Sequence, residues 1–207
     1  MTKTWFYLWA APLFLLAAPV QAQVNSVVHG FSLGAHLQGA GLDPENALDD
    51  RGGGAGIDIG YGFRNALSLF LTFGVGAMEP EEDKQGASYA LSGLDIGARY
   101  SFRGEAARWR PHVEAALTTM LATFEDVRFG DSPSADVEIR GPAFTVGGGI
   151  EYFFVPRWST GLGIRWSSGS FDEVQVGNVT VELDPEDEFD VRTTRLQLGV
   201  RYHFAGS

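Results

Sequence analysis

Eight ionisable side chains occur at alternating positions within stretches that are otherwise apolar or rich in glycine, and they could form ion pairs. In an extended chain, alternate side chains lie on the same face. Four of the eight are acids and four are bases, so their charges would balance on that face. The residues are Asp58, Asp95, Glu114 and Glu151, together with Arg99, Arg165, Arg195 and Arg201. Because charges removed from water must be paired, they predict a network of buried ion pairs.

Other reactive side chains show no catalytic or metal-binding spacing. His36, His112 and His203 lie at alternating positions of three separate segments, so we expect them to hydrogen-bond within the charged network. None of the four histidines is followed two residues later by a serine, as we would expect in a lipid-modifying enzyme. There is no cysteine, and the glycine-rich segment 52–56 lacks the lysine of a phosphate loop. We therefore expect no enzyme, no metal site and no cofactor.

The charged positions lie in eight segments in which apolar and polar residues alternate, and each segment is predicted to be a strand. Their lengths approach the ~10 residues that a tilted membrane strand needs. The predicted strands are 30–38, 56–63, 67–76, 93–102, 112–121, 144–154, 158–167 and 194–204. Short turns alternate with the polar loops 40–54, 78–88, 125–141 and 168–192. This plan predicts an all-β fold, an eight-stranded antiparallel up-and-down transmembrane β-barrel.

One segment leaves the strand count open. Residues 174–176 and 179–181 each place valines around a polar residue, with Gly177-Asn178 between them, as in a two-residue hairpin. We expect this hairpin to extend the seventh and eighth strands above the membrane. A ten-stranded barrel is the alternative.

The first 22 residues are typical of a secretory signal peptide. Lys3 precedes an apolar stretch, residues 5–18, and we expect cleavage after Ala22. The domain assignment is therefore a signal peptide at 1–22 and a barrel domain at 23–207, with an uncleaved anchor helix as the alternative. No later segment approaches the ~20 apolar residues of a membrane helix. If the mature chain resides in a membrane, it must cross as a closed barrel.

Aromatic pairs recur at the end of every second predicted strand. The pairs are Tyr61 and Phe63, Tyr100 and Phe102, Tyr152 and Phe154, and Tyr202 and Phe204. All would point outward at one height and form an aromatic belt at a membrane interface. Phe124, Phe144 and Trp166 are expected to form a sparser belt at the opposite interface. A soluble ligand-binding barrel of the lipocalin type, the structural alternative, has no reason to place four such pairs at one level.

Charge is distributed unevenly between the two ends of the predicted barrel. The net charge is −11, which argues against nucleic acid as a partner. The four polar loops hold 21 of the 26 acidic residues and five basic residues, whereas the short turns are basic. Such acidic loops form a candidate contact surface. Their carboxylates could also share divalent cations with the phosphates of lipopolysaccharide.

The last predicted strand resembles the carboxy-terminal signal by which the bacterial assembly machinery recognises outer-membrane barrels. The matching residues are Gln197, Gly199, Tyr202 and Phe204, although three residues follow Phe204. Nearly all of residues 23–204 is similar in architecture to the transmembrane barrels of the outer-membrane protein A and protein X group. The resemblance implies a location in the bacterial outer membrane, among its lipids and lipopolysaccharide. We expect the chain to be monomeric.

These features favour a non-enzymatic protein with a structural or surface-interaction role. Envelope integrity, or adhesion through acidic extracellular loops, is what the resemblance and the charge distribution together indicate. Paired charges would fill the narrow interior of an eight-stranded barrel. A porin-like channel for small solutes is the alternative.

Overall fold

The structure is a computed structural model of residues 1–207. It describes residues 29–44, 50–63, 66–79, 88–102, 107–127, 134–177, 179–184, 186 and 189–204. The expected signal peptide and its cleavage site lie outside the described residues, as does the expected turn at residues 64–65. Within the described residues, no helix is long and apolar enough to cross a membrane.

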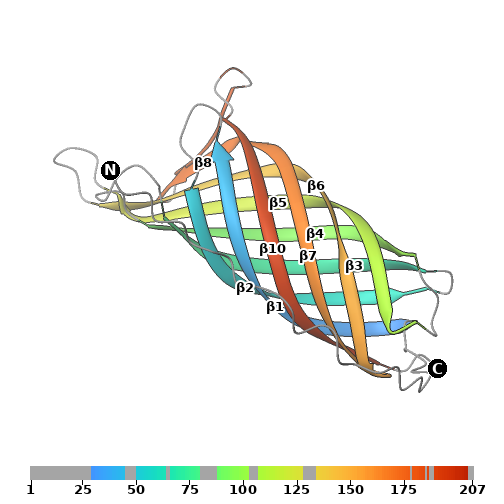
Figure 1. Cartoon of the computed structure of the whole chain (residues 1–207). Helices are drawn as coiled ribbons and strands as arrows, with labels where there is room; N and C mark the ends of the chain where they lie inside the picture. The colour runs from blue at the N-terminus through green and yellow to red at the C-terminus, as the bar shows by residue number, and fades with distance from the viewer. Residues whose placement is uncertain are drawn as a thin grey trace, which may run out of the picture.

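Eight long antiparallel strands form a closed, tilted barrel (Figure 1). Each strand pairs with its neighbour along the chain, and β1 pairs with β10 from Ser32–His203 to Pro44–Val191 to close the wall. The wall strands are β1 (Gly30–Pro44), β2 (Asp50–Gly62), β3 (Leu67–Glu79), β4 (Tyr89–Ser101), β5 (Trp109–Val127), β6 (Ala135–Val155), β7 (Trp158–Phe171) and β10 (Phe189–His203). The predicted eight-stranded transmembrane barrel is confirmed.

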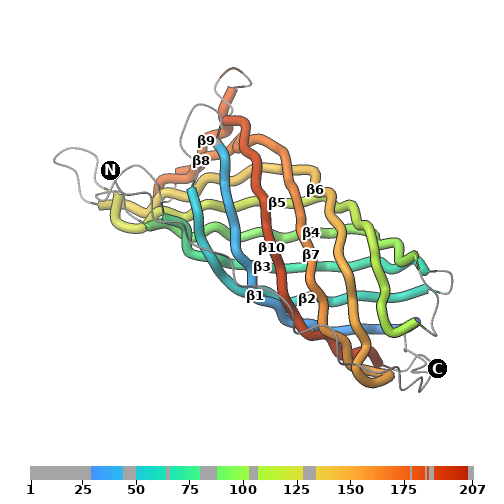
Figure 2. Tube along the Cα trace, viewed as in Figure 1, coloured from blue at the N-terminus to red at the C-terminus, as the bar shows by residue number. Residues whose placement is uncertain are grey.

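The two remaining strands, β8 (Glu173–Val176) and β9 (Val179–Glu182), form the expected hairpin outside the ring of the barrel. Figures 1 and 2 place it at the end where β1 ends and β10 begins. The expectation that it prolongs the seventh and eighth strands is confirmed: β8 continues the course of β7 along β6, from Arg140–Glu173 to Val137–Val176 after a one-residue shift in register, and β9 pairs with β8 as β10 pairs with β7. The β6–β7 pairing reaches only Ala143 and Gly169. The backbone of β6 beyond that point needs another partner, and β8 supplies it.

The wall strands continue well into the segments expected to be loops. β1 and β2 remain paired as far as Leu42 and Asp50, and β5 is paired with β6 as far as Val127 and Ala135. The expected loop boundaries at 40–54 and 125–141 are therefore wrong. The paired strands outrun the ~10 residues needed to cross a bilayer, so the barrel extends above it.

The two parts of the barrel have opposite polarity. In the membrane-spanning part, large apolar side chains face outward on every strand, as Leu37, Ile96, Leu117, Leu162 and Leu196 illustrate. In the extracellular extension, the outward positions are polar and the apolar side chains are buried inside. The buried cluster comprises Leu42, Met78, Tyr89, Leu91, Met120, Ala122, Ala143, Phe171 and Val191. The extension is thus built like a soluble barrel, with its own apolar core.

Phe124 illustrates this change of polarity. It was expected in the outer aromatic belt, but it faces inward, stacks on Tyr89 with ring centroids 4.7 Å apart and packs against the buried cluster. The expectation is wrong because the strand keeps its alternation above the membrane while the environment outside changes from lipid to water. Phe144 and Trp166 are exposed on the outer wall, as expected.

Candidate functional site

The upper half of the charged network centres on Arg165, which reaches two acids from different strands. Its Nη1 lies 2.9 Å from Asp95 Oδ2, and its Nε lies 2.6 Å from Glu114 Oε1. Glu114 also accepts from Arg99 Nη2 at 2.8 Å, and Asp95 accepts from Arg195 Nη2 at 3.1 Å. The five side chains form one chain of ion pairs. Arg165 and Arg195 reach across the lumen to strands that are not their neighbours, whereas Arg99 and Glu114 lie opposite each other on the adjacent strands β4 and β5.

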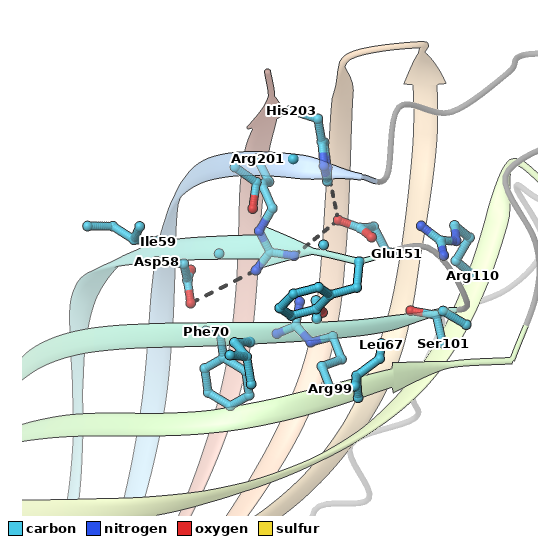
Figure 3. A pocket seen from close by; sticks show the side chains of 18 residues that line it. Asp58, Ile59, Leu67, Phe70, Arg99, Ser101, Arg110, Glu151, Arg201 and His203 are labelled. Atoms are coloured by element: carbon cyan, nitrogen blue, oxygen red, sulfur yellow. Dashed lines mark hydrogen bonds and ion pairs between the residues drawn. The ribbon is translucent and has the colours of Figure 1, made fainter. Parts of the chain in front are cut away.

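The lower half is built around Arg201, near the periplasmic end (Figure 3). Its Nη1 lies 3.1 Å from Glu151 Oε1, and its Nη2 lies 3.9 Å from Asp58 Oδ1. Each of these two acids also contacts a histidine: His36 Nδ1 lies 2.9 Å from Asp58, and His203 Nε2 lies 3.4 Å from Glu151. All eight charges that the sequence placed on one face therefore lie in the lumen, and each has at least one partner of opposite charge.

Hydroxyl groups satisfy acceptor sites that the bases leave open. Thr72 donates to Asp58 at 2.7 Å, and Ser159 donates to Glu151 at 2.8 Å. Thr118 donates to Asp95 at 2.8 Å. Its oxygen also lies 2.5 Å from Thr145, which in turn lies 2.7 Å from Ser167. Sequence analysis missed these hydroxyls, although they share the inward positions of their strands.

Little space remains between the charged groups. A cavity of about 40 Å³ lies near Arg201 and His203 (Figure 3), and one of about 50 Å³ lies beside His36 and His112. Such volumes hold a few water molecules, since one water needs roughly 10–15 Å³ measured in this way. The guanidinium groups of Arg99 and Arg165 lie 5.4 and 5.1 Å from the ring centre of Phe70, which fills further space.

The apolar cluster of the extension lies on the extracellular side of this network. Met78 and Val191 are almost completely buried within it. Tyr89 donates a hydrogen bond of 2.6 Å to Asp50 at the edge of the cluster. Burial, strengthened by this hydrogen bond to a carboxylate, raises the pKa of the Tyr89 hydroxyl well above its ordinary value. The interior is thus filled by a charged layer below and an apolar layer above.

The predicted aromatic belt lies at the periplasmic end of the wall, and the predicted terminal signal runs to that end from the middle of β10, where Gln197 pairs with Gln38. Six of the eight belt rings are exposed: Tyr61, Phe63, Tyr100, Phe102, Phe154 and Phe204. The other two, Tyr152 and Tyr202, are partly covered because Trp109 and Trp158 pack on them, at ring distances of 4.5 and 5.1 Å. In the terminal strand, Gln197 faces the lumen beside His36, and Gly199 faces inward against the backbone of β1.

The extracellular end is strongly acidic. Its described residues include thirteen carboxylates and three arginines. The carboxylates are those of Asp43, Asp50, Glu79, Glu125, Asp126, Asp136, Glu138, Asp172, Glu173, Glu182, Asp184, Glu186 and Asp190. In the part of the chain that the structure describes, no group of three or more acids, histidines or cysteines has a geometry that could hold a metal ion.

The closed ring of eight antiparallel strands, with an apolar outer band and a charged interior, defines a small transmembrane β-barrel of the bacterial outer membrane. Residues 10–204 match the family described as outer membrane protein beta-barrel domain. The chain belongs to this family.

Solved structures with the same fold include three small barrels. Neisserial surface protein A matches with a TM-score of 0.62 at 20% identity, covering 84% of this chain and 97% of that protein. The attachment invasion locus protein Ail of Yersinia pestis matches at 0.52 and 14% identity, covering 84% and 99%. OprG from Pseudomonas aeruginosa matches at 0.53 and 10% identity, covering 88% and 100%. Comparison with curated protein sequences finds no match.

Proposed function

We propose that the protein is a non-enzymatic, non-conducting surface protein of the outer membrane, which acts as a monomer through its acidic extracellular end. The observation that carries the proposal is the filled interior. Paired charges occupy the membrane-spanning lumen, and the buried apolar cluster occupies the extension above it. A solute would have to disrupt both layers, so function is assigned to the outer surface.

The extracellular charge supports a contact role. Thirteen described carboxylates against three arginines create a negative potential, which attracts cationic partners and increases their rate of association. Two classes of role fit such a surface: adhesion to basic molecules, and sharing of divalent cations with lipopolysaccharide to maintain the envelope. The names of two proteins with the same fold, a surface protein and an attachment invasion locus protein, are in keeping with a surface role.

Two measurements test the proposal. The first is single-channel recording of refolded protein in a planar bilayer, with a heat-shift gel to verify folding. We expect no conductance steps, and reproducible steps would overturn the closed-lumen part. The second compares cells that display the natural chain with cells that display a variant carrying Glu182→Gln, Asp184→Asn and Glu186→Gln. Adherence to a surface of basic protein, or resistance to detergent, should fall in the variant. Unchanged values of both would overturn the surface role.

A further inference from the structure

The hairpin ends in a strand with one unpaired edge. In the sheet order, β9 is terminal and follows β6 and β8. Its four residues pair with β8 from Val176–Val179 to Glu173–Glu182, and no other described strand pairs with them. All four residues of β9 are exposed. An unpaired edge of this kind presents backbone donors and acceptors to any extended segment that approaches it.

The printed register identifies which backbone groups face outward. The amide of Leu183 donates to the carbonyl of Asp172 at 2.8 Å, so these residues form a hydrogen-bonded pair. In an antiparallel ladder, hydrogen-bonded and non-hydrogen-bonded pairs alternate. The backbone N–H and C=O groups of Val179 and Val181 therefore form hydrogen bonds with β8, whereas those of Thr180 and Glu182 point to the free edge. The amide of Gly177, which donates to Asp136 on β6 at 3.0 Å, fits the same alternation on the other side of β8.

The side chains of β9 give the edge two different faces. Val179 and Val181 are 64% and 54% exposed, and they continue an apolar face that begins on β6 with Val137 and Ile139. On the opposite face, Glu182 lies directly across from Glu173. Glu173 is paired with Arg140 at 3.2 Å, but no described base lies within ion-pairing distance of Glu182.

We propose that β9 binds an extended segment of a partner protein, in which apolar residues alternate with lysine or arginine, by adding it as a further strand. This inference rests on the proposed surface role and names the chemistry of the partner. Backbone pairing would occur at Thr180 and Glu182. The partner's apolar side chains would pack on Val179 and Val181, and its basic side chains would lie beside Glu182. Backbone hydrogen bonds would provide affinity and the alternating side chains specificity.

A second copy of this chain fits the edge poorly. Pairing β9 with β9 would bring two acidic hairpins together, and like charges placed opposite each other in a sheet are destabilising. The short, acidic edge thus discourages self-association, as edges of natural sheets commonly do. The same charge attracts a basic strand.

The test uses the full mature chain in nanodiscs of zwitterionic lipid, so that the lipid itself does not attract cations. The probe is a short labelled peptide in which valine and lysine alternate, and binding is measured by fluorescence anisotropy. Two control peptides are used: one with the same sequence but N-methylated at alternate residues, and one with glutamate in place of lysine. Isotope-edited infrared spectra of the bound probe report whether it forms a paired strand.

Two variants at one position separate backbone pairing from charge. Thr180→Pro removes an outward N–H without removing a bond to β8, and proline is tolerated in edge strands when its N side faces solvent. Thr180→Val keeps that N–H. We expect Thr180→Pro to weaken binding by about tenfold or more and Thr180→Val by less than about twofold. Glu182→Gln should weaken binding and reduce its dependence on salt.

Equal binding by the two Thr180 variants, or equal binding of the N-methylated peptide, would overturn strand addition. If proteolysis shows that Thr180→Pro disrupts the hairpin, the comparison of methylated and unmethylated peptides decides alone. If strand addition is overturned but the peptide still binds in a salt-dependent way, the proposed acidic contact surface is still supported. Absence of binding by every peptide would overturn strand addition, and the adherence assay would still decide the surface role independently.

Discussion

Arg165 and Asp95 form an ion pair of 2.9 Å in the middle of the lumen, with side chains that are 2% and 0% exposed. The two residues come from β7 and β4, which are not neighbours in the wall. Their contact ties opposite sides of the barrel together. Removing one partner from such a buried pair leaves an uncompensated charge, which is more costly than the loss of the pair itself.

Replacing Arg165 by methionine should therefore destabilise the barrel by about 3–5 kcal/mol, because Asp95 and Glu114 both lose a partner. Urea unfolding in lipid vesicles, followed by tryptophan fluorescence, measures the change. Arg192→Gln is the control: Arg192 is exposed, and its loss should change stability by less than about 0.5 kcal/mol. Equal unfolding midpoints for the two variants would contradict the central role of Arg165.

Two glycines of the wall should respond in opposite ways to alanine. A Cβ at Gly54 would overlap the carbonyl oxygen of Val75, whereas a Cβ at Gly39 meets nothing within 4 Å. Gly54→Ala should cost about 1–3 kcal/mol, as expected for overpacking, and Gly39→Ala should cost little. Refolding yield and the urea midpoint on a heat-shift gel provide the comparison. A larger loss for Gly39→Ala would show that the inner wall is not closely packed at Gly54.

The raised pKa of Tyr89 predicts a pH dependence at the alkaline end. Above the ordinary tyrosine pKa of about 10, the unfolded chain releases this proton while the folded chain retains it. The stability that Tyr89 contributes is thus fully present below pH about 10 and is lost as the pH rises further. Tyr89→Phe should cost about 1 kcal/mol at neutral pH, through loss of the bond to Asp50, and less above pH 10.

Unfolding midpoints of the natural chain and Tyr89→Phe, measured at neutral pH and above pH 10, test this prediction. The other tyrosines are common to both chains, so the difference isolates Tyr89. A difference between the two midpoints that increased with pH would contradict the prediction.

Truncating side chains in the buried apolar cluster should destabilise the barrel without making it conduct ions. Met78 and Met120 are both buried in this cluster, and changing each to alanine should cost about 2–5 kcal/mol. The charged layer beneath would still fill the lumen, so a planar bilayer containing the double variant should remain silent. Conductance steps that appear in this variant alone would assign closure to the apolar layer rather than to the ion pairs.

Alternation along the strands was sufficient to place the eight charges on the inner face, because side-chain direction in a strand has a period of two. It could not assign partners. Arg165 pairs with Asp95, 70 positions away in the sequence, because the stagger of the closed barrel brings their levels together. Stagger depends on the pairing of all eight wall strands. No local pattern contains it.

The extension was missed for a different reason. An outward apolar face identifies the strands of the membrane-spanning part, whereas the apolar residues Leu42, Met78 and Tyr89 of the extension lie on the inward face. Polar outward positions such as Asp43 and Glu79 then resembled loop sequence. The alternation itself continues through both parts; only the side that carries the apolar residues changes, because water replaces lipid outside.

This change of side fixes how deeply the barrel sits in the bilayer. Moving it outward would expose Leu117 and Leu196 to water, and moving it inward would bring Arg192 and Asp43 toward hydrocarbon. Both displacements are unfavourable, so the protein has little freedom to rise or sink. The hairpin therefore stays at a constant height above the lipid headgroups. A partner molecule must therefore reach that height above the membrane to contact the hairpin.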